Sequence, residues 1–292
     1  MQSNFQRIYP GLQLAYYGLV LVLVFLVKHP LELAILWIAV VASMIYMNKL
    51  FGTNDFKQDV KLYAFPLLFA LLAGIVNALF RYYGMNPIFA LPSGNRVTWD
   101  AFIDGGLGGF RFGLSLLWLK HMYDYMDTNR VLYLFKPLFP TFSLLLTLVL
   151  RFFPHFLEQS GELVTVNKLK IRDRKLGFKD RWQNRADVLA KLSSWGLESS
   201  IVTGEMMQAR GHGLVKKKTQ YTLYKWTPRD SIIMLVVLVL GIVYFYLRSL
   251  GVLEFISYPF IYTVAWSSLN YINLAALSII AFVPLLTDLR RY

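Results

Sequence analysis

Long apolar runs constrain this chain more than any other feature of its sequence. Crossing a bilayer takes about 20 mostly apolar residues, because the hydrocarbon layer is roughly 30 Å thick and a helix rises about 1.5 Å per residue. Such runs occur at residues 11–27, 31–47, 60–80, 101–119, 131–153, 231–247 and 269–286. The sequence therefore predicts an all-α integral membrane protein.

The composition agrees with a membrane protein and excludes other classes. Hydrophobic residues make up 56% of the chain and charged residues only 16%, whereas a soluble domain carries about 25% charged residues. The absence of cysteine excludes a disulfide scaffold and a thiolate metal site. The four histidines, His29, His121, His155 and His212, are scattered, so we expect no metal site and no cofactor.

The charges that flank the apolar runs predict six or seven transmembrane helices. Lys and Arg gather on the cytoplasmic side of spans. Four spans before residue 154 would place the N-terminus, Lys49, Lys57 and Lys61 inside, whereas five would place them outside, against this rule. The run at 131–153 contains two prolines, and it is the segment that we expect not to be a simple crossing.

A basic segment separates two membrane blocks. Residues 168–229 hold 15 Lys and Arg against 5 Asp and Glu, which is most of the excess positive charge of the chain. We therefore divide the chain into an N-terminal transmembrane block at 1–153, cytoplasmic helices at 154–229 and C-terminal transmembrane helices at 230–292.

The spacing of apolar residues predicts three short amphipathic helices in this insertion. The first covers residues 156–169. The second covers 188–195 and ends at Gly196, and the third covers 202–209 and stops at Gly211. Three such apolar faces need cover, either from a partner protein or from the membrane surface.

The residues around Arg210 carry the most specific signal. Ala209-Arg210-Gly211 ends the third predicted helix, and Arg151-Phe152-Phe153-Pro154 closes an apolar run between 50 and 60 residues earlier. This pattern resembles the Ala-Arg-Gly motif and the Arg-Phe-Ile-Pro segment of the transmembrane T component of energy-coupling factor (ECF) transporters, the EcfT/CbiQ-like family. The order of spans, basic helical insertion and closing spans is also similar.

The resemblance implies a membrane scaffold that is not an enzyme. In that bacterial family the T component couples ATP hydrolysis by two ABC ATPase subunits to uptake of a vitamin or metal ion through a separate substrate-binding membrane S component. Its helical insertion supplies the coupling helices, on the cytoplasmic side of the cell membrane. The resemblance implies that Arg210 is the main coupling residue, that Ala209 and Gly211 shape the helix tip, and that Met206 and Met207 pack in the docking groove.

The sequence departs from the family at the first of the two arginine motifs. The position of that motif, counted from Arg151, holds Leu169-Lys170-Ile171 in this chain, and Arg172 follows directly. Lysine keeps the charge but lacks the planar fork of donors of arginine. Lys170 and Arg172 are therefore the candidates for a second ATPase contact. The N-terminal Pro-Arg-x-Lys-Leu pattern of the family is also degraded, to Pro10-Gly11-Leu12-Gln13-Leu14.

Helix chemistry gives the Ala-Arg-Gly residues a physical role that is independent of the family. The helix dipole favours an arginine at a C-terminus, and glycine lets the chain turn in the left-handed region. Small Ala209 admits a close neighbour, and the two methionines offer adaptable apolar contacts. The alternative for Arg210 is a solvated arginine that only caps its helix.

Two groups of charged residues have alternative interpretations. Asp104 and Arg111 lie seven residues apart in a glycine-rich span, so they either function inside the membrane or lie at its interface. For Lys216, Lys217 and Lys218 we favour anchoring to anionic lipid over docking of a partner.

Other function classes lack their signatures. The sequence contains no GxxxxGK[ST] phosphate loop, no HExxH and no evident pair of intramembrane carboxylates, so ATP must be hydrolysed by another chain. The basic insertion has no stacking-aromatic or groove-helix pattern for nucleic acid. The rival is a stand-alone secondary transporter of a small solute, although no internal repeat relates the two unequal membrane blocks.

Overall fold

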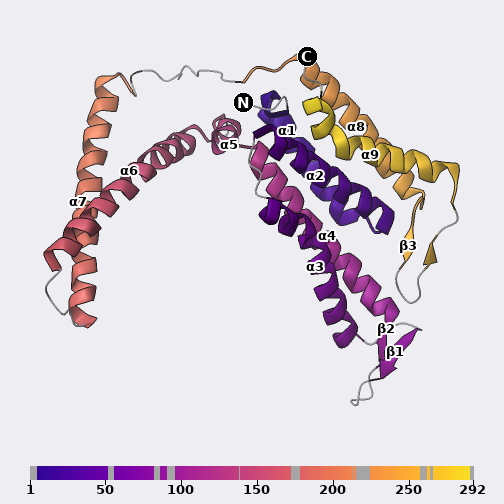
Figure 1. Cartoon of the computed structure of the whole chain (residues 1–292). Helices are drawn as coiled ribbons and strands as arrows, with labels where there is room; N and C mark the ends of the chain where they lie inside the picture. Colours follow the sequence, from indigo (N-terminus) through magenta and orange to yellow (C-terminus); the bar gives the residue numbers. More distant parts are fainter. Residues whose placement is uncertain are drawn as a thin grey trace. The chain divides into compact units, whose positions relative to one another are not determined.

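The computed structural model describes residues 5–51, 56–81, 86–90, 96–137, 139–171, 178–212, 214, 224–256, 262–263 and 266–289. It contains two compact units (Figure 1). Unit 1 comprises Met1–Val131 and Tyr224–Tyr292, and unit 2 is the intervening Leu132–Leu223.

Unit 1 is a bundle of helices, and unit 2 interrupts its chain after residue 131. A 3₁₀ turn at Phe5–Arg7 precedes the first helix. The helices are α1 (Pro10–Leu26), α2 (Pro30–Phe51), α3 (Phe56–Phe80), α4 (Trp99–Tyr125), α8 (Pro228–Ser249) and α9 (Ser268–Leu289). Two small antiparallel hairpins connect them, β1 (Pro87–Ala90) with β2 (Arg96–Thr98) and β3 (Phe255–Ile256) with β4 (Tyr262–Thr263).

The helices confirm an all-α membrane protein. Five helices in the described part of the chain are long and apolar enough to span a bilayer, namely α2, α3, α8 and α9 of unit 1 and α6 of unit 2. Helix α1 is apolar but shorter. Helix α4 has 27 residues, and its glycines and charged side chains make it less apolar than these.

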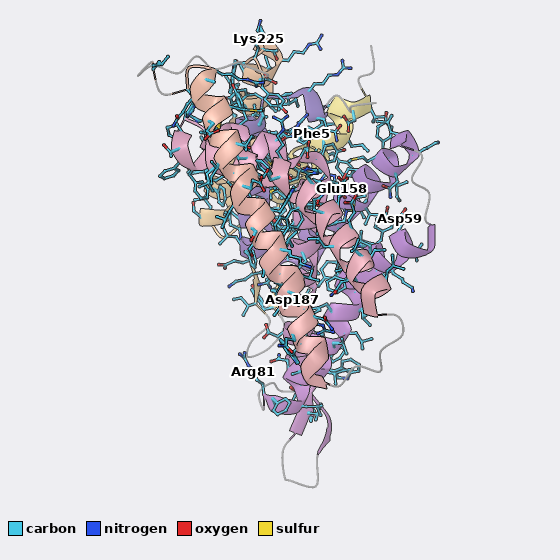
Figure 2. The ribbon with its side chains drawn as sticks, turned by 90° about the vertical axis from the view of Figure 1, so that its left-hand side faces the viewer. Phe5, Asp59, Arg81, Glu158, Asp187 and Lys225 are labelled. Carbon is cyan, nitrogen blue, oxygen red and sulfur yellow. The ribbon has the colours of Figure 1, made fainter. Side chains whose placement is uncertain are left out.

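The helices of unit 1 alternate in direction between two ends of the bundle. At one end, here called the terminal end, the Phe5 N–H donates to Asp288 near the end of α9 (2.8 Å), and Tyr9 packs on Trp226. At the other, the hairpin end, His29 packs against Phe255 (5.9 Å between ring centroids). Figure 2 shows the labelled Lys225 and Phe5 toward one end and Arg81 toward the other. Four helices thus precede unit 2 and two follow it, so no fifth early crossing is needed within unit 1.

Aromatic rings fill the core of unit 1 close to the terminal end. The Phe5 ring makes edge-to-face contacts with Tyr16, Tyr17 and Tyr125, at centroid distances of 5.8, 6.1 and 5.1 Å. All four side chains are buried. Edge-to-face contacts of this kind add to the stabilisation that burial itself gives, so the short N-terminal segment is part of the core.

Glycines of α4 form its contact with α3. Gly105, Gly109 and Gly113 recur every fourth residue and lie on one face. A Cβ at Gly105 would lie 2.3 Å from Asn77 Cβ, and one at Gly109 would lie 2.4 Å from Ala73 Cβ. Small residues let two membrane helices approach closely. The glycine cluster that lowers the hydropathy of α4 therefore joins it to α3.

The chain leaves and re-enters unit 1 at neighbouring points. Arg130 is buried, and its guanidinium donates to the Gln13 side chain (3.1 Å) and lies over the Tyr224 ring, 5.4 Å from its centroid. The last residues before unit 2 and the first residue after it are therefore joined by one contact.

Unit 2 is built on two long helices. Helix α5 (Thr128–Phe135) leads into it, followed by α6 (Pro140–Ile171) and α7 (Phe178–Ala209), each of the latter with 32 residues. The Trp195 ring of α7 packs on His155 and Phe156 of α6, and the Asn167 side chain donates to the Asn184 carbonyl (3.3 Å). These contacts make α6 and α7 an antiparallel pair.

The predicted helix boundaries in this region need correction. The apolar run at 131–153 is interrupted between α5 and α6, as its prolines predicted, but α6 then continues through Pro154. The predicted end at Gly196 is wrong, because α7 is continuous through it and joins the second and third predicted helices. A Cβ at Gly196 would meet the Phe156 ring at 3.7 Å, so this glycine faces α6 instead of ending a helix. The membrane and cytoplasmic ranges 1–153, 154–229 and 230–292 stay a prediction.

Candidate functional site: the tip of helix α7

The C-terminus of α7 closes in a Schellman motif. Gly211 has a φ of +82°, its N–H donates to the Gln208 carbonyl (2.9 Å), and the His212 N–H donates to the Met207 carbonyl (2.9 Å). This pair of bonds satisfies carbonyls that a helix end leaves free. The left-handed turn predicted at Gly211 is confirmed, and Arg210 is the capping residue at the end of the helix.

The predicted contact residues lie on the surface of this tip. The side chains of Ala209 and Arg210 are exposed, Met206 is 58% exposed and Met207 is half-buried. No hydrogen bond or ion pair joins the Arg210 guanidinium to another residue in the described part of the chain. The tip thus presents one cation beside an apolar, adaptable methionine.

The candidates for the second contact lie at the far end of the same helix pair. Lys170 lies in the last turn of α6, which ends at Ile171; its side chain and the whole of Arg172 fall outside the described residues. Because α6 and α7 are antiparallel, the end of α6 lies beside the start of α7. At about 1.5 Å per residue, the length of α7 separates Lys170 from Arg210 by roughly 45 Å. The structure does not bring the two candidates together.

Apolar side chains follow both helices of unit 2 on their outer surfaces. Those of α6 and α7 that are more than half exposed include Leu157, Val166, Leu169, Trp182, Leu189, Leu197, Ile201 and Met206. Leu192, by contrast, is buried in the pair. Exposed apolar surface of this extent marks an interaction site with protein or membrane.

Charged groups also lie inside unit 1. Asp104 and Arg111 of α4 are half-buried, and the buried Arg111 Nε has no partner among the described residues. Glu32 of α2 is fully buried; it accepts from the Tyr244 hydroxyl (3.1 Å) and pairs with Arg248 (3.4 Å). Sequence reasoning missed Glu32, although a lone carboxylate in an apolar run signals an internal partner. The three lysines at 216–218 lie outside the described residues.

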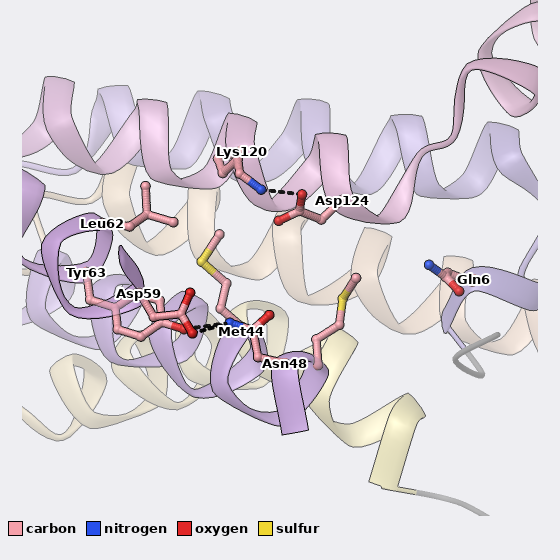
Figure 3. Close-up of a pocket in the computed structure, with 9 residues that line it drawn as sticks. Gln6, Met44, Asn48, Asp59, Leu62, Tyr63, Lys120 and Asp124 are labelled. Atoms are coloured by element: carbon pink, nitrogen blue, oxygen red, sulfur yellow. Dashed lines mark hydrogen bonds and ion pairs between the residues drawn. The ribbon is translucent and has the colours of Figure 1, made fainter. Parts of the chain in front are cut away.

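A cavity of about 510 Å³ opens at the terminal end of unit 1, between α2, α3 and α4 (Figure 3). Its lining is Gln6, Met44, Met47, Asn48, Asp59, Leu62, Tyr63, Lys120 and Asp124. These residues come from four separate segments, so no local motif predicts them. Within the described ranges, no group of three or more His, Asp or Glu side chains is arranged to hold a metal ion.

Comparison with known proteins shows a distant similarity. No family model matches the chain. The chain is 23% identical over 239 residues to the energy-coupling factor transporter transmembrane protein EcfT of Streptococcus equi subsp. equi (strain 4047), which covers 71% of this chain and 88% of that protein. With the apolar helices, this similarity supports a multi-pass membrane protein with a role in transport.

Proposed function

We propose that this chain is the transmembrane scaffold and transducer subunit of an ECF-type ABC importer. In this proposal the cytoplasmic coupling helices that dock two ABC ATPase subunits are α7 and the part of α6 from residue 154 onward. The spans of unit 1 hold a separate substrate-binding S component that takes up a vitamin or a metal ion. The chain itself is not an enzyme.

The observation that carries the proposal is the α7 tip. The Schellman motif fixes the backbone around Arg210, so this backbone has little freedom to lose when the exposed side chain binds a partner. A guanidinium forms short, charge-assisted bonds with carboxylates. A groove on an ATPase with acidic and apolar groups would fit Arg210 and Met206 together.

The two ends of the α6–α7 pair suit two ATPases. A nucleotide-binding pair changes its separation during ATP binding and hydrolysis, and a rigid lever must contact both members to transmit that motion. Contacts roughly 45 Å apart, at Arg210 and at Lys170 or Arg172, would allow one α6–α7 pair to reach both subunits.

Charge supports a cytoplasmic position for the terminal end. Arg7, Lys49, Lys61, Lys225 and Arg229 lie in the segments that meet there. Lys and Arg close to span ends favour the cytoplasmic side. The chain enters and leaves unit 2 at this same end, so α6 and α7 start from the compartment that holds ATP.

The decisive experiment is charge reversal at the tip. We expect Arg210→Glu to abolish ATP-driven uptake in cells, because a carboxylate would face the acidic groove, while the amount of protein in the membrane stays unchanged. Lys191→Glu is the matched control, since it reverses the same charge at an exposed position of the same helix, away from both of its ends. Full uptake by Arg210→Glu, or equal loss in both variants, would contradict the assignment.

A stand-alone secondary transporter is the second candidate, and the internal charges Glu32 and Arg111 favour it. It predicts that the purified chain transports a solute in liposomes without ATP. The scaffold proposal predicts instead that mild-detergent purification from native membranes yields ABC ATPase subunits and a small hydrophobic protein, identified by mass spectrometry.

A further inference from the structure

The cavity at the terminal end of unit 1 lies at the height of lipid headgroups. The candidate span of α2 ends at Leu50, and that of α3 begins at Asp59. Asn48 and Asp59 of the lining therefore sit where two spans leave the hydrocarbon. The cavity volume of about 510 Å³ is within the range of small-molecule sites, roughly 300 to 1,000 Å³.

One wall of the cavity holds a positioned carboxylate. The Asn48 side-chain amide donates to one oxygen of Asp59 (2.8 Å) and also to the Tyr63 hydroxyl (3.2 Å). No described residue donates a hydrogen bond to the other Asp59 oxygen. Because Tyr63 accepts from Asn48, its own O–H proton is available to donate. This wall offers one strong acceptor and one donor.

The opposite wall holds an ammonium group. Lys120 and Asp124 of α4 form an ion pair one helical turn apart and face Asp59 and Tyr63 across the cavity (Figure 3). The Lys120 ammonium has three protons and Asp124 engages one of them. The two carboxylates and one ammonium give the lining a net negative charge.

Apolar side chains complete the site. Met44, Met47 and Leu62 line the space between the two polar walls, and methionine adapts its shape to flexible chains. These side chains offer an apolar contact beside the two polar walls.

We propose that this cavity binds a phospholipid whose headgroup carries a primary ammonium, such as phosphatidylethanolamine. The ammonium donates to Asp59, the phosphate accepts from Lys120 and Tyr63, and an acyl chain contacts Met44, Met47 and Leu62. A choline headgroup has no N–H to donate to Asp59, and an anionic headgroup is repelled by the net charge of the lining. The site is separate from the α7 tip and does not depend on docking of an ATPase.

Native mass spectrometry of the full-length protein in detergent tests this proposal. The protein is titrated with dihexanoyl phosphatidylethanolamine, dihexanoyl phosphatidylcholine, dihexanoyl phosphatidylglycerol and O-phosphoethanolamine. We expect the ethanolamine lipid to bind about tenfold more tightly than the other two lipids, which corresponds to one charge-assisted hydrogen bond. Free phosphoethanolamine should bind more weakly, because it lacks the chains that contact Met44 and Leu62. Equal affinity for all three lipids, or for the free headgroup, would overturn the proposal.

Two variants locate the binding. Asp59→Asn should weaken binding of the ethanolamine lipid about ten- to hundredfold, whereas Asp127→Asn, an exposed carboxylate outside the cavity, should not. Tyr63→Phe keeps the ring and removes only the hydroxyl group, so it tests the site if Asp59→Asn does not purify as a single species. An unchanged affinity in both cavity variants overturns the proposal. So does an Asp59→Asn protein that loses a co-purified protein partner but keeps its lipid, because the cavity would then be a protein interface.

Discussion

The guanidinium of Arg210 follows the last turn of α7, and the direction it takes depends on the backbone of the next two residues. The hydrogen bonds from Gly211 and His212 back to the helix hold that backbone. Only the φ of +82° at Gly211 makes both bonds possible, and residues with a Cβ reach this region at a cost of roughly 1–2 kcal/mol. The charge and the glycine therefore act together.

Gly211→Ala and Gly204→Ala should have opposite effects. Alanine at Gly211 strains the left-handed turn, so we expect faster amide hydrogen exchange over residues 207–212 and reduced ATP-driven uptake. Gly204 lies inside α7 with no atom within 4 Å of an added Cβ, so alanine there should slow exchange by stabilising the helix by up to about 1 kcal/mol. Faster exchange in both variants would show that the turn is not the cause.

Single buried polar residues also connect helices that are distant in the sequence. Asp288 near the end of α9 accepts from the Phe5 N–H and from the Tyr125 hydroxyl, each at 2.8 Å. His121 bonds Tyr17 through Nδ1 (2.9 Å) and Ser43 through Nε2 (2.8 Å), while the Ser43 hydroxyl donates to the Val40 carbonyl. Nε2 must then carry the ring proton, and Nδ1 accepts from Tyr17. His121 is thus a neutral link between α1, α2 and α4.

At the scale of elements, the apolar runs predicted where helices lie but not where all of them end. The run at 60–80 became α3, and Gly211 ends α7 as predicted. Gly196 and Pro154, however, lie inside helices. A glycine inside a helix costs only about 1 kcal/mol, which packing of α7 on Phe156 can offset. Whether a glycine caps a helix or faces a neighbour depends on tertiary contacts that a single sequence does not contain.

Some of the candidate functional residues could likewise be predicted from the sequence, and others could not. The Ala209-Arg210-Gly211 tip is local, so its geometry could be predicted from three residues and the pattern before them. The cavity and the contacts of Glu32 could not be predicted, because the residues that form them are distant in the sequence. Glu32, for example, contacts Tyr244 and Arg248, more than 200 residues later.

Contact between α3 and α4 should depend on one face of α4. In Gly109→Ala, the new methyl group would lie 2.4 Å from Ala73 Cβ and 2.7 Å from the Phe69 carbonyl oxygen, so the helices must separate. We expect a loss of about 1–3 kcal/mol, measured by thermal unfolding in detergent. The neighbouring Gly108 has open space around it, and Gly108→Ala should be neutral or slightly stabilising. Equal stability of the two variants would contradict this packing.

At the scale of the whole molecule, the absence of cysteine allows a direct test of topology. Single cysteines are introduced at exposed residues of each end: Arg7 and Lys225 at the terminal end, Arg81 and Glu254 at the hairpin end. A membrane-impermeant thiol reagent should label the first pair from one side of sealed vesicles and the second pair from the other. Labelling of Arg7→Cys and Arg81→Cys from the same side would contradict the alternating arrangement.

The Arg130–Tyr224 contact bears on how such a bundle assembles. Because Arg130 and Tyr224 are in contact, the chain between them forms a closed loop. Helices α8 and α9 can therefore dock on the first four helices as if they followed α4 directly. The entropy of closing such a loop grows only slowly with its length, by about 0.6 kcal/mol for each doubling of a flexible loop. Residues can therefore be gained or lost within the loop at little entropic cost to the bundle that carries it.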